Sequence, residues 1–527
     1  MRYSDKNIDI DYNSRKINSG IFYEKGCIQM KIFLSTSQER QVKLIKLLAD
    51  TPKYSSIPEI AKRLNCGITT VSRDISEINT IFVENHIKEA EILISHWGIL
   101  LVTGVTFNIK KILLIYLKSS IPFTYFNLVF NAKTIQTINF IEQFYISEST
   151  FYRNIKSLTH FLQDNKIGLI KKQDAAHVLI GDEKKIRQFA FHYYWYAYQG
   201  MEWPFPNIDR AAILDFINEL NRKHNLNYSK IDKEKYLYVI AVSLIRVQQG
   251  NFIKIYNNEV FQFYNIQPLS QDLKSFFVHL GLSEEQSQTE ALYLFLYTRT
   301  LVTTLSSKID RIFAMEMHKE SDTFIHKMAL LITEAVQETF DLTLNMRDQD
   351  TVNELFSLSY SLIFNSISPD IFEIYSWIDY FSNSYPLLIT HLDALVKKIN
   401  EGFNKILPNF YYQITKDNEE VMRMQFIQFL LKYIDTNQFL PKIRIKIYSS
   451  REPYMIQYIE STISNKLDIN PEFVDADEQN YDLLLTDALT PELVANEKKK
   501  IVLWSFPFSV GDFERLKDFI IAWNKSD

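Results

Sequence analysis

Two short segments of the chain carry the same pattern of hydroxyl, arginine and apolar side chains. The first reads TVSRDI at residues 70–75, and the second reads TFYRNI at residues 150–155. An arginine can donate to both acceptors of a guanine base or to a phosphate, and serine and threonine hydroxyls reach the same groups. A helix that buries its apolar side and exposes these groups suits the major groove of DNA. The pattern therefore predicts two DNA-contacting helices.

The individual contact residues follow from helical spacing. The apolar positions are predicted to be buried, and they are Val71, Ile75 and Ile78 in the first helix and Phe151, Ile155 and Leu158 in the second. The polar positions between them are the predicted DNA contacts, namely Thr69, Thr70, Ser72, Arg73 and Ser76, then Ser149, Thr150, Tyr152, Arg153 and Lys156. Most of these side chains are expected to bind phosphate, and we expect Arg73 and Arg153 to reach DNA most directly.

A helix-turn-helix is the element that would position the first set. Ser56 and Glu59 fit a capping box at the start of one helix, and Asn65-Cys66-Gly67 ends it before a second helix begins near Ile68. Residues 39–49 predict a scaffold helix, and a separate charged helix is predicted from residue 80 to about 91. Two β-prone runs over residues 92–104, broken near His96–Gly98, predict a β-hairpin of the kind called a wing. An ordinary helical hairpin is the alternative for one such motif.

The second motif has its own surrounding elements. A lead-in helix is predicted over residues 134–144, Ser147 is the predicted N-cap of the contact helix, and residues 165–180 predict a second hairpin with Lys171 and Lys172 near phosphate. Repeated supersecondary units usually indicate a duplicated function. The repeat therefore argues against a chance match. It also predicts that the second motif is the better capped and the more basic of the two.

Composition and charge limit the class of protein. The 527 residues include only 12 Gly and 14 Pro, which favours a mainly helical, multidomain chain with short connections. Two cysteines, Cys27 and Cys66, exclude a disulfide framework and a cysteine-based zinc site and favour a reduced cytoplasm. Residues 1–180 carry 23 Lys and Arg against 16 Asp and Glu, whereas the rest of the chain is acidic. A basic front on an acidic body would keep phosphate binding at one end.

The two ends of the chain differ from its middle. Residues 1–35 have no sustained periodicity and are predicted to be a disordered tail, with Met30 as an alternative start. No apolar run is long enough to span a bilayer and no signal peptide is predicted, so we expect no membrane partner.

The spacing of apolar residues predicts helices over residues 210–300, 309–340 and 351–406. Beyond residue 440, strands and helices alternate, which predicts a small parallel α/β domain.

The order of these motifs resembles one known family. The two TxxR-type helices are followed by IGDEKKIRQF at 180–189 and EWPF at 202–205, as in the Mga/AtxA-type transcriptional regulators of Gram-positive bacteria. The resemblance covers nearly the whole chain from about residue 36. It implies winged helix-turn-helix domains over residues 36–105 and 106–180, and two helical regulation domains of the phosphotransferase-system type (PRD) over residues 181–305 and 306–420. It also implies a domain similar to a sugar-transporter EIIB component over residues 421–527.

The resemblance also implies a function and partners. It predicts an activator of virulence or carbohydrate-linked genes that binds double-stranded promoter DNA and forms a homodimer or a higher oligomer. It names phosphocarrier proteins of the phosphotransferase system as candidate partners. An active EIIB component carries a phosphorylated cysteine after its first strand, where this chain has Ser449, Ser450 and Arg451. Phosphotransfer through the C-terminal domain is therefore not expected.

Phosphorylation sites and catalytic sites are weakly marked. The family's regulation domains carry histidines in helices that resemble residues 236–246 and 290–297, and this chain has none there. His224 and His391 remain the candidate phosphorylation sites, with ordinary surface or core histidines as the alternative. No glycine-rich phosphate loop, GxSxG or HExxH motif occurs, so no enzyme, metal or cofactor is predicted. The alternatives left open are a PRD-type RNA-binding antiterminator and a phosphotransferase-system component.

Overall fold

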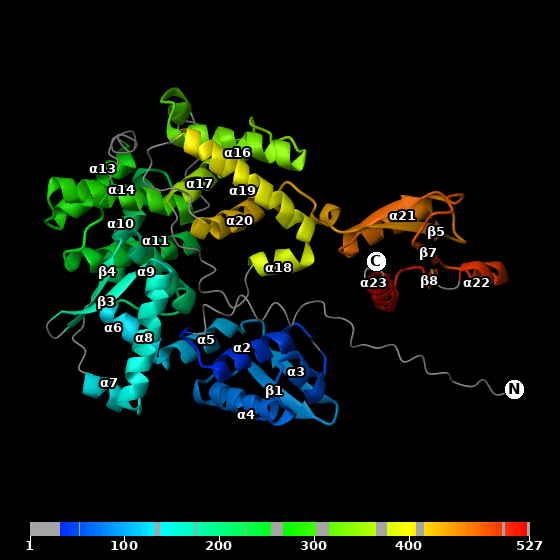
Figure 1. Cartoon of the computed structure of the whole chain (residues 1–527), viewed down its shortest axis with the longest axis horizontal. Helices are drawn as coiled ribbons and strands as arrows, with labels where there is room; N and C mark the ends of the chain where they lie inside the picture. The colour runs from blue at the N-terminus through cyan, green and yellow to red at the C-terminus, as the bar shows by residue number, and fades with distance from the viewer. Residues whose placement is uncertain are drawn as a thin grey trace. The chain divides into compact units, whose positions relative to one another are not determined.

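The computed structural model describes most of the chain, which Figure 1 colours from blue at the N-terminus to red at the C-terminus. The described residues are 32–51, 53–131, 137–173, 176–226, 228–254, 267–301, 316–364, 377–406, 416–497 and 501–523. Most of the predicted tail over residues 1–35 lies outside these ranges. The described residues form two compact units, of which the smaller holds residues 380–393 and 427–523. The prediction of a mainly helical, multidomain chain is confirmed.

The first helix-turn-helix region (residues 36–103) contains three helices and a hairpin. They are α2 (Thr36–Ala49), α3 (Ile57–Arg63), α4 (Ile68–Glu84), β1 (Ala90–Ser95) and β2 (Gly98–Thr103). The separate helix predicted over residues 80–91 is wrong, because α4 continues unbroken to Glu84. The helix stops where His86 takes a left-handed backbone conformation (φ 54°) and the N–H of Ile87 turns back to the carbonyl of Phe82.

The second helix-turn-helix region (residues 109–181) contains two helices that the sequence patterns did not predict. Its elements are α5 (Ile109–Lys118), α6 (Ile121–Phe130), α7 (Thr137–Gln143), α8 (Glu148–Asp164), β3 (Gly168–Gln173) and β4 (Ala176–Gly181). Helices α5 and α6 form the scaffold under α8 and the hairpin, since α6 packs on both α8 and β4. The start of the lead-in helix predicted at residue 134 lies outside the described residues.

Helices make up the middle of the chain. They are α9 (Glu183–Tyr198), α10 (Arg210–Lys223), α11 (Lys230–Gln248), α13 (Pro268–His279), α14 (Glu284–Leu301), α16 (Phe324–Phe340), α17 (Gln349–Phe364), α18 (Trp377–Ser384), α19 (Pro386–Ile406) and α20 (Lys416–Leu430). Helix α9 connects several of the others. Its Tyr193 hydroxyl donates to the carbonyl of Phe123 in α6 (2.6 Å), and its Gln188 amide donates to the carbonyl of Phe364 in α17 (2.7 Å).

The smaller unit contains the α/β fold, drawn in orange and red in Figure 1. Its four strands are parallel and lie in the order β6-β5-β7-β8, as the alternating pattern predicted. Ile445, Leu483 and Leu485 are fully buried in its core. The elements are η5 (Thr436–Phe439), β5 (Lys442–Tyr448), α21 (Tyr454–Lys466), β6 (Asn470–Val474), β7 (Leu483–Thr486), α22 (Pro491–Glu497), β8 (Ile501–Leu503) and α23 (Val510–Trp523).

The lengths and apolar character of the helices bear on whether the chain could span a membrane. Among the described residues, no single helix is long and apolar enough to cross a bilayer. Helices α5 and α6 meet the requirement only when taken together, and they are bent by 76° at their junction.

Candidate nucleic-acid interface

The two helix-turn-helix regions repeat one backbone at a constant offset in residue number. Helix α3 (Ile57–Arg63) corresponds to α7 (Thr137–Gln143) at both ends, and α4 (Ile68–Glu84) corresponds to α8 (Glu148–Asp164) in the same way. The left-handed residue of the turn recurs as Asn65 and Tyr145, both with φ of 50°. The left-handed residue after each contact helix recurs as His86 and Lys166, with φ of 54° and 53°. The hairpins follow at a slightly smaller offset, so the second lies closer to its helix.

The burial pattern of the two contact helices follows the same repeat. Val71 and Phe151 are equivalent and buried, and so are Ile78 and Leu158. Ile75 is also buried, but its equivalent Ile155 is only half-buried, so the prediction of a buried Ile155 is wrong. The predicted DNA-contacting residues lie on the outer side of the two helices. Thr70 and Thr150 are half-buried. The others are exposed, and they are Thr69, Ser72, Arg73, Ser76, Ser149, Tyr152, Arg153 and Lys156.

An ion pair to a fully buried aspartate distinguishes α4 from α8. Asp74 has no exposed side-chain surface, and its carboxylate accepts from the Nε and Nη2 atoms of Arg40 in α2 at 2.5 and 2.9 Å. Gln41 donates to the carboxylates of Asp74 (3.3 Å) and Glu77 (2.5 Å), and it accepts from the Tyr116 hydroxyl of α5 (2.6 Å). These bonds fix α4 to its scaffold helices. No local pattern in the sequence predicts them, because the partners belong to different helices.

Helix α8 presents a more basic outer side than α4. Asn154 replaces the buried aspartate, and among the described residues its side-chain amide bonds to the Thr150 carbonyl within the same helix (2.8 Å) and to no other helix. The exposed positions next to it carry Arg153 and Lys156, whereas α4 offers Arg73 and the exposed carboxylate of Glu77. A net positive helix surface attracts phosphate more strongly than a neutral one. The predicted basic character of the second motif is consistent with this placement.

The two contact helices also start differently. The Ser147 hydroxyl accepts from the backbone N–H of Thr150 (3.2 Å), which satisfies one open donor at the start of α8. Gly67 occupies the equivalent position of α4 and provides no side-chain cap. The predicted difference in capping is therefore confirmed. Ser56 likewise accepts from the N–H of Glu59 at the start of α3, at 3.3 Å. The predicted capping box is only half formed, because the Glu59 carboxylate does not accept from the Ser56 N–H among the described bonds.

The first hairpin is fastened at its tip. The backbone of Ser55 exchanges two hydrogen bonds of 2.9 Å with Ile99 in β2. Gly98 has a φ of 118°, and a Cβ atom there would lie 2.3 Å from the Ser55 carbonyl oxygen, so no other residue fits without a backbone shift. Beside it, Trp97 is 69% exposed, with its ring centroid 4.4 Å from that of His96. An exposed tryptophan on a fixed tip can contact a ligand.

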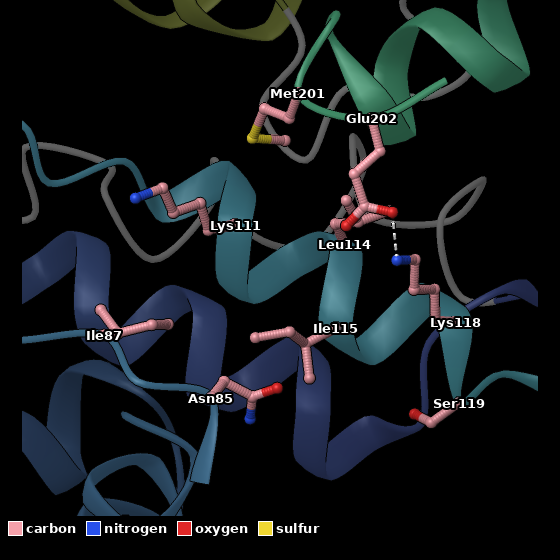
Figure 2. A pocket seen from close by; sticks show the side chains of 9 residues that line it. All are labelled: Asn85, Ile87, Lys111, Leu114, Ile115, Lys118, Ser119, Met201 and Glu202. Carbon is pink, nitrogen blue, oxygen red and sulfur yellow. Dashed lines mark hydrogen bonds and ion pairs between the residues drawn. The ribbon is translucent and has the colours of Figure 1, made fainter. Parts of the chain in front are cut away.

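A pocket of about 620 Å³ lies beside the first region, and Figure 2 shows its lining. Lys118 of α5 faces Glu202 of the EWPF segment there, and their ammonium and carboxylate groups are 2.5 Å apart. Both side chains are about half exposed, so water screens the pair. Nearby, the hydrogen bond from Lys111 lowers the pKa of Glu89. The pocket is lined by Asn85, Ile87, Lys111, Leu114, Ile115, Lys118, Ser119, Met201 and Glu202.

The candidate phosphorylation sites are engaged in local hydrogen bonds. The Nε2 atom of His224 lies 2.6 Å from the carboxylate of Asp272, which also binds Lys223. The Nδ1 atom of His391 lies 2.9 Å from the Leu387 carbonyl in its own helix. His318 is more deeply buried, and burial lowers its pKa to about 3, so its ring is neutral. A phosphoryl group at His224 Nε2 would displace the Asp272 carboxylate.

The loop after β5 holds a carboxylate from its own unit. Asp487 accepts from the backbone N–H of Ser450 (2.7 Å) and from the hydroxyls of Ser449 and Ser450 (3.1 Å each). These are the residues at the position where an EIIB component would carry its cysteine. The loop's donors therefore already bind an anionic group. Within the described parts of the chain, no group of three or more His, Cys, Asp or Glu residues could hold a metal ion.

Comparison with known proteins identifies the second region. Residues 105–194 match the Mga helix-turn-helix domain, which spans α5 through most of α9. The chain is 24% identical over 360 residues to the capsule synthesis positive regulator AcpB of Bacillus anthracis, covering 68% of each protein. This match and these relatives support an Mga/AtxA-type transcriptional regulator.

Other relatives align over different lengths. A Streptococcus pneumoniae serotype 4 protein with the provisional name trans-acting regulator is 20% identical over 520 residues, covering 90% of this chain and 95% of that protein. The anthrax toxin expression trans-acting positive regulator of Bacillus anthracis is 22% identical over 321 residues, 58% of this chain and 62% of that protein. The family consists of transcription regulators and not of enzymes, as the sequence motifs predicted.

Proposed function

We propose that this Mga/AtxA-type regulator is a transcription activator that binds double-stranded promoter DNA through two winged helix-turn-helix domains. The observation that carries the proposal is the equivalence of Arg73 and Arg153, which lie at the same exposed position of two matching contact helices. Neither guanidinium forms an ion pair with another described residue. Each is therefore available for a phosphate or a guanine base.

The role as an activator is supported by the names of the relatives. AcpB is named a positive regulator of capsule synthesis, and the other Bacillus anthracis relative is named a positive regulator of toxin expression. We propose that this chain activates virulence or carbohydrate-linked genes in the same way, and that it acts in the cytoplasm, where promoter DNA lies. The contact set is the one predicted from the sequence, and most of its members would bind phosphate and set the register on DNA.

The remaining domains would regulate this activity. Residues 181–305 and 306–420 would be PRD-like helical domains, and residues 421–527 an EIIB-like domain that mediates a homodimer or a higher oligomer. The parallel four-stranded sheet supports an EIIB-like domain, and the Asp487 carboxylate in its loop argues against phosphotransfer there. His224 and His391 stay the candidate sites for phosphorylation by phosphocarrier proteins, where an added double negative charge would change the local packing.

Promoters must be identified before binding is measured. Chromatin immunoprecipitation with sequencing of the full chain would give the promoters it occupies. Fluorescence anisotropy with one of those duplexes and with a hairpin RNA of matched length then separates DNA binding from antitermination. We expect tight binding to the duplex, weakening steeply as salt rises because phosphate contacts release counterions. Preference for the hairpin RNA would favour the antiterminator.

A transfer assay tests the other alternative. The full chain is incubated with a phosphocarrier protein that bears labelled phosphate, and the label is then located by peptide mapping. We expect none on residues 421–527, because Ser449 and Ser450 replace the nucleophilic cysteine and are bonded to Asp487. Stable label in that region would favour a phosphotransferase-system component. Label on His224 or His391 would instead support regulation by phosphorylation.

A further inference from the structure

The C-terminal end of helix α11 is hydrogen-bonded to the second hairpin. Arg246 donates from Nη2 to the backbone carbonyl of Leu179 in β4 (3.2 Å), so a residue of the helical block binds directly to a strand of the helix-turn-helix region. The same guanidinium binds the carboxylate of Glu183 at 2.8 to 3.3 Å and donates to the Gln249 side-chain oxygen (2.9 Å). Only 2% of the Arg246 side chain is exposed. Its position is therefore fixed by several bonds at once.

A second contact reaches the scaffold of the same region. The side-chain amide of Gln249 donates to the backbone carbonyl of Phe130, the last residue of α6 (2.7 Å). Open carbonyls at the end of a helix need such partners. Because Gln249 also accepts from Arg246, one connected pair binds both the hairpin and the scaffold helix.

Arg246 is connected through Glu183 to a buried ion pair between Arg187 and Glu290. Glu183 also accepts from Nε of Arg187 (2.9 Å), and the Arg187 guanidinium binds both oxygens of Glu290 in α14 at 2.5 and 2.9 Å. Arg187 and Glu290 have no exposed side-chain surface. Buried networks whose members are all bonded are rigid, and they lose much stability if one member is removed. Helices α9, α11 and α14 thus share one network that ends at the hairpin.

We infer that Arg246 and Gln249 are positioning residues for the second DNA-binding region, through which helices α11 and α14 set the placement of its hairpin. The inference rests on the proposed function, because it takes the second region to bind DNA. Leu179 pairs with Ile170 in the hairpin, and the next pair is Lys171 with Val178. A hairpin held at Leu179 therefore keeps Lys171 at a fixed distance from α8. A change in the packing of α11 would move Arg246 and Gln249, and with them the hairpin and the scaffold helix whose carbonyls they bind.

Conservative variants separate positioning from general stability. Gln249→Glu keeps an acceptor for Arg246 but loses the donor to the Phe130 carbonyl, and Gln249→Met loses both. Arg246→Lys keeps the positive charge, but an ammonium group cannot make the whole set of bonds to Leu179, Glu183 and Gln249. Gln286→Met is the matched control. It removes the bond from the N–H of Ser283 to the Gln286 side-chain oxygen, which involves neither the hairpin nor the scaffold helix.

Two readouts are measured on the full chain. Hydrogen exchange without DNA reports the protection of residues 168–181, and anisotropy with a bound promoter duplex reports affinity. We expect Arg246→Lys and Gln249→Met to speed exchange in the hairpin and to weaken DNA binding about threefold to tenfold, the effect of losing one or two hydrogen bonds. Gln249→Glu should retain more affinity than Gln249→Met. The control Gln286→Met should leave both readouts at the wild-type level.

The outcomes distinguish this inference from the proposed function. Unchanged hairpin exchange in Arg246→Lys and Gln249→Met would overturn the inference, and so would faster exchange with unchanged DNA affinity. Equal losses in Gln286→Met would also overturn it, because they would show a general loss of stability. If the wild-type chain bound no duplex at all, the proposed function would fail, and the exchange comparison would still decide whether the pair positions the hairpin.

Discussion

The two helix-turn-helix regions share a backbone but are stabilised by different side chains. In the first, the contact helix is fixed to its scaffold by the ion pair between Arg40 and the fully buried Asp74. The equivalent position in the second carries Asn154, whose side chain, among the described residues, bonds within its own helix. The second is instead packed around aromatic rings, with Phe151 edge-on to Tyr125 at 5.9 Å. One fold can therefore be maintained by charge in one copy and by aromatic packing in the other.

The difference extends to the surface that would face DNA. In the first region the outer side of α4 carries one exposed arginine, Arg73, together with the exposed carboxylate of Glu77, so its charges cancel. In the second region Arg153 and Lys156 are both exposed, and the hairpin is held to the helical block by Arg246. We therefore expect the second region to make the stronger DNA contact and to be the one coupled to the rest of the chain.

The largest expected effect comes from breaking the ion pair of the first region. Arg40→Met leaves the fully buried Asp74 carboxylate without its cation, which should destabilise the first region by ~3–5 kcal/mol. Hydrogen exchange of residues 68–84 measures the loss locally. The double variant Arg40→Met with Asp74→Leu should recover most of it, since an apolar pair needs no partner. Asn154→Ala, at the equivalent position of the second region, should cost far less, and similar losses in both would contradict the comparison.

DNA contact should be weaker in the first region than in the second. Arg153→Ala is expected to weaken promoter binding by ~1–3 kcal/mol if the guanidinium meets a base edge, and Arg73→Ala by less. Anisotropy over a salt series measures both affinity and the number of phosphate contacts. Lys156→Ala should lower the salt slope, while Ser76→Ala, its equivalent in α4, should not. Unchanged affinity and salt slope in both arginine variants would refute the placement of these helices on DNA.

Exchanging the caps tests the smaller difference between the contact helices. Ser147→Ala should destabilise α8 by about 1 kcal/mol, because the Thr150 N–H loses its partner. Gly67→Ser should stabilise α4 by a few tenths of a kcal/mol. A Cβ atom at Gly67 would meet only the Thr70 and Thr69 hydroxyls, at ordinary contact distances of 3.7 and 3.8 Å. Hydrogen-exchange rates at residues 68–71 and 148–151 check both changes. If Gly67→Ser destabilised α4, the role of Gly67 as the uncapped N-cap position would be disproved.

The smallest effect uses the one cysteine among the described residues. Cys66 lies in the turn of the first region, and burial raises the pKa of its thiol. Less thiolate is therefore present at neutral pH, so alkylation by iodoacetamide should be slow near pH 7 and should rise with pH later than for an ordinary thiol. In a Cys27→Ser background, promoter DNA should slow it further if the first region is bound. Equal rates with and without DNA would indicate that the second region binds alone.

Local signals in the sequence were sufficient for the contact helices, the turns and the hairpins. Ser147, Gly67 and the apolar spacing marked α4 and α8, because caps and helical period depend on neighbouring residues. The sequence patterns did not predict helix α6 (IPFTYFNLVF), because it is apolar on nearly all sides and gives little helical period. The false helix over residues 80–91 arose because a left-handed His86 has no strong local signal.

Interactions between distant residues could not be predicted at all. Arg187 and Glu290 are 103 residues apart and Arg246 and Leu179 are 67 apart, and a single sequence carries no information on such pairings. The charged residues were visible, but their burial depends on which helices come together in three dimensions. The match to the Mga helix-turn-helix domain covers residues 105–194, which include the two helices α5 and α6 that the sequence patterns did not predict.

The loop after β5 has a consequence for what the C-terminal unit can sense. Its hydroxyls and backbone N–H are occupied by the Asp487 carboxylate, so the shape of the loop does not depend on the supply of any outside anion. A binding site can report the concentration of a ligand only if it is unoccupied for part of the time. In this structure Asp487 occupies the donors of the loop, and a response to nutrient level through them would first require Asp487 to leave.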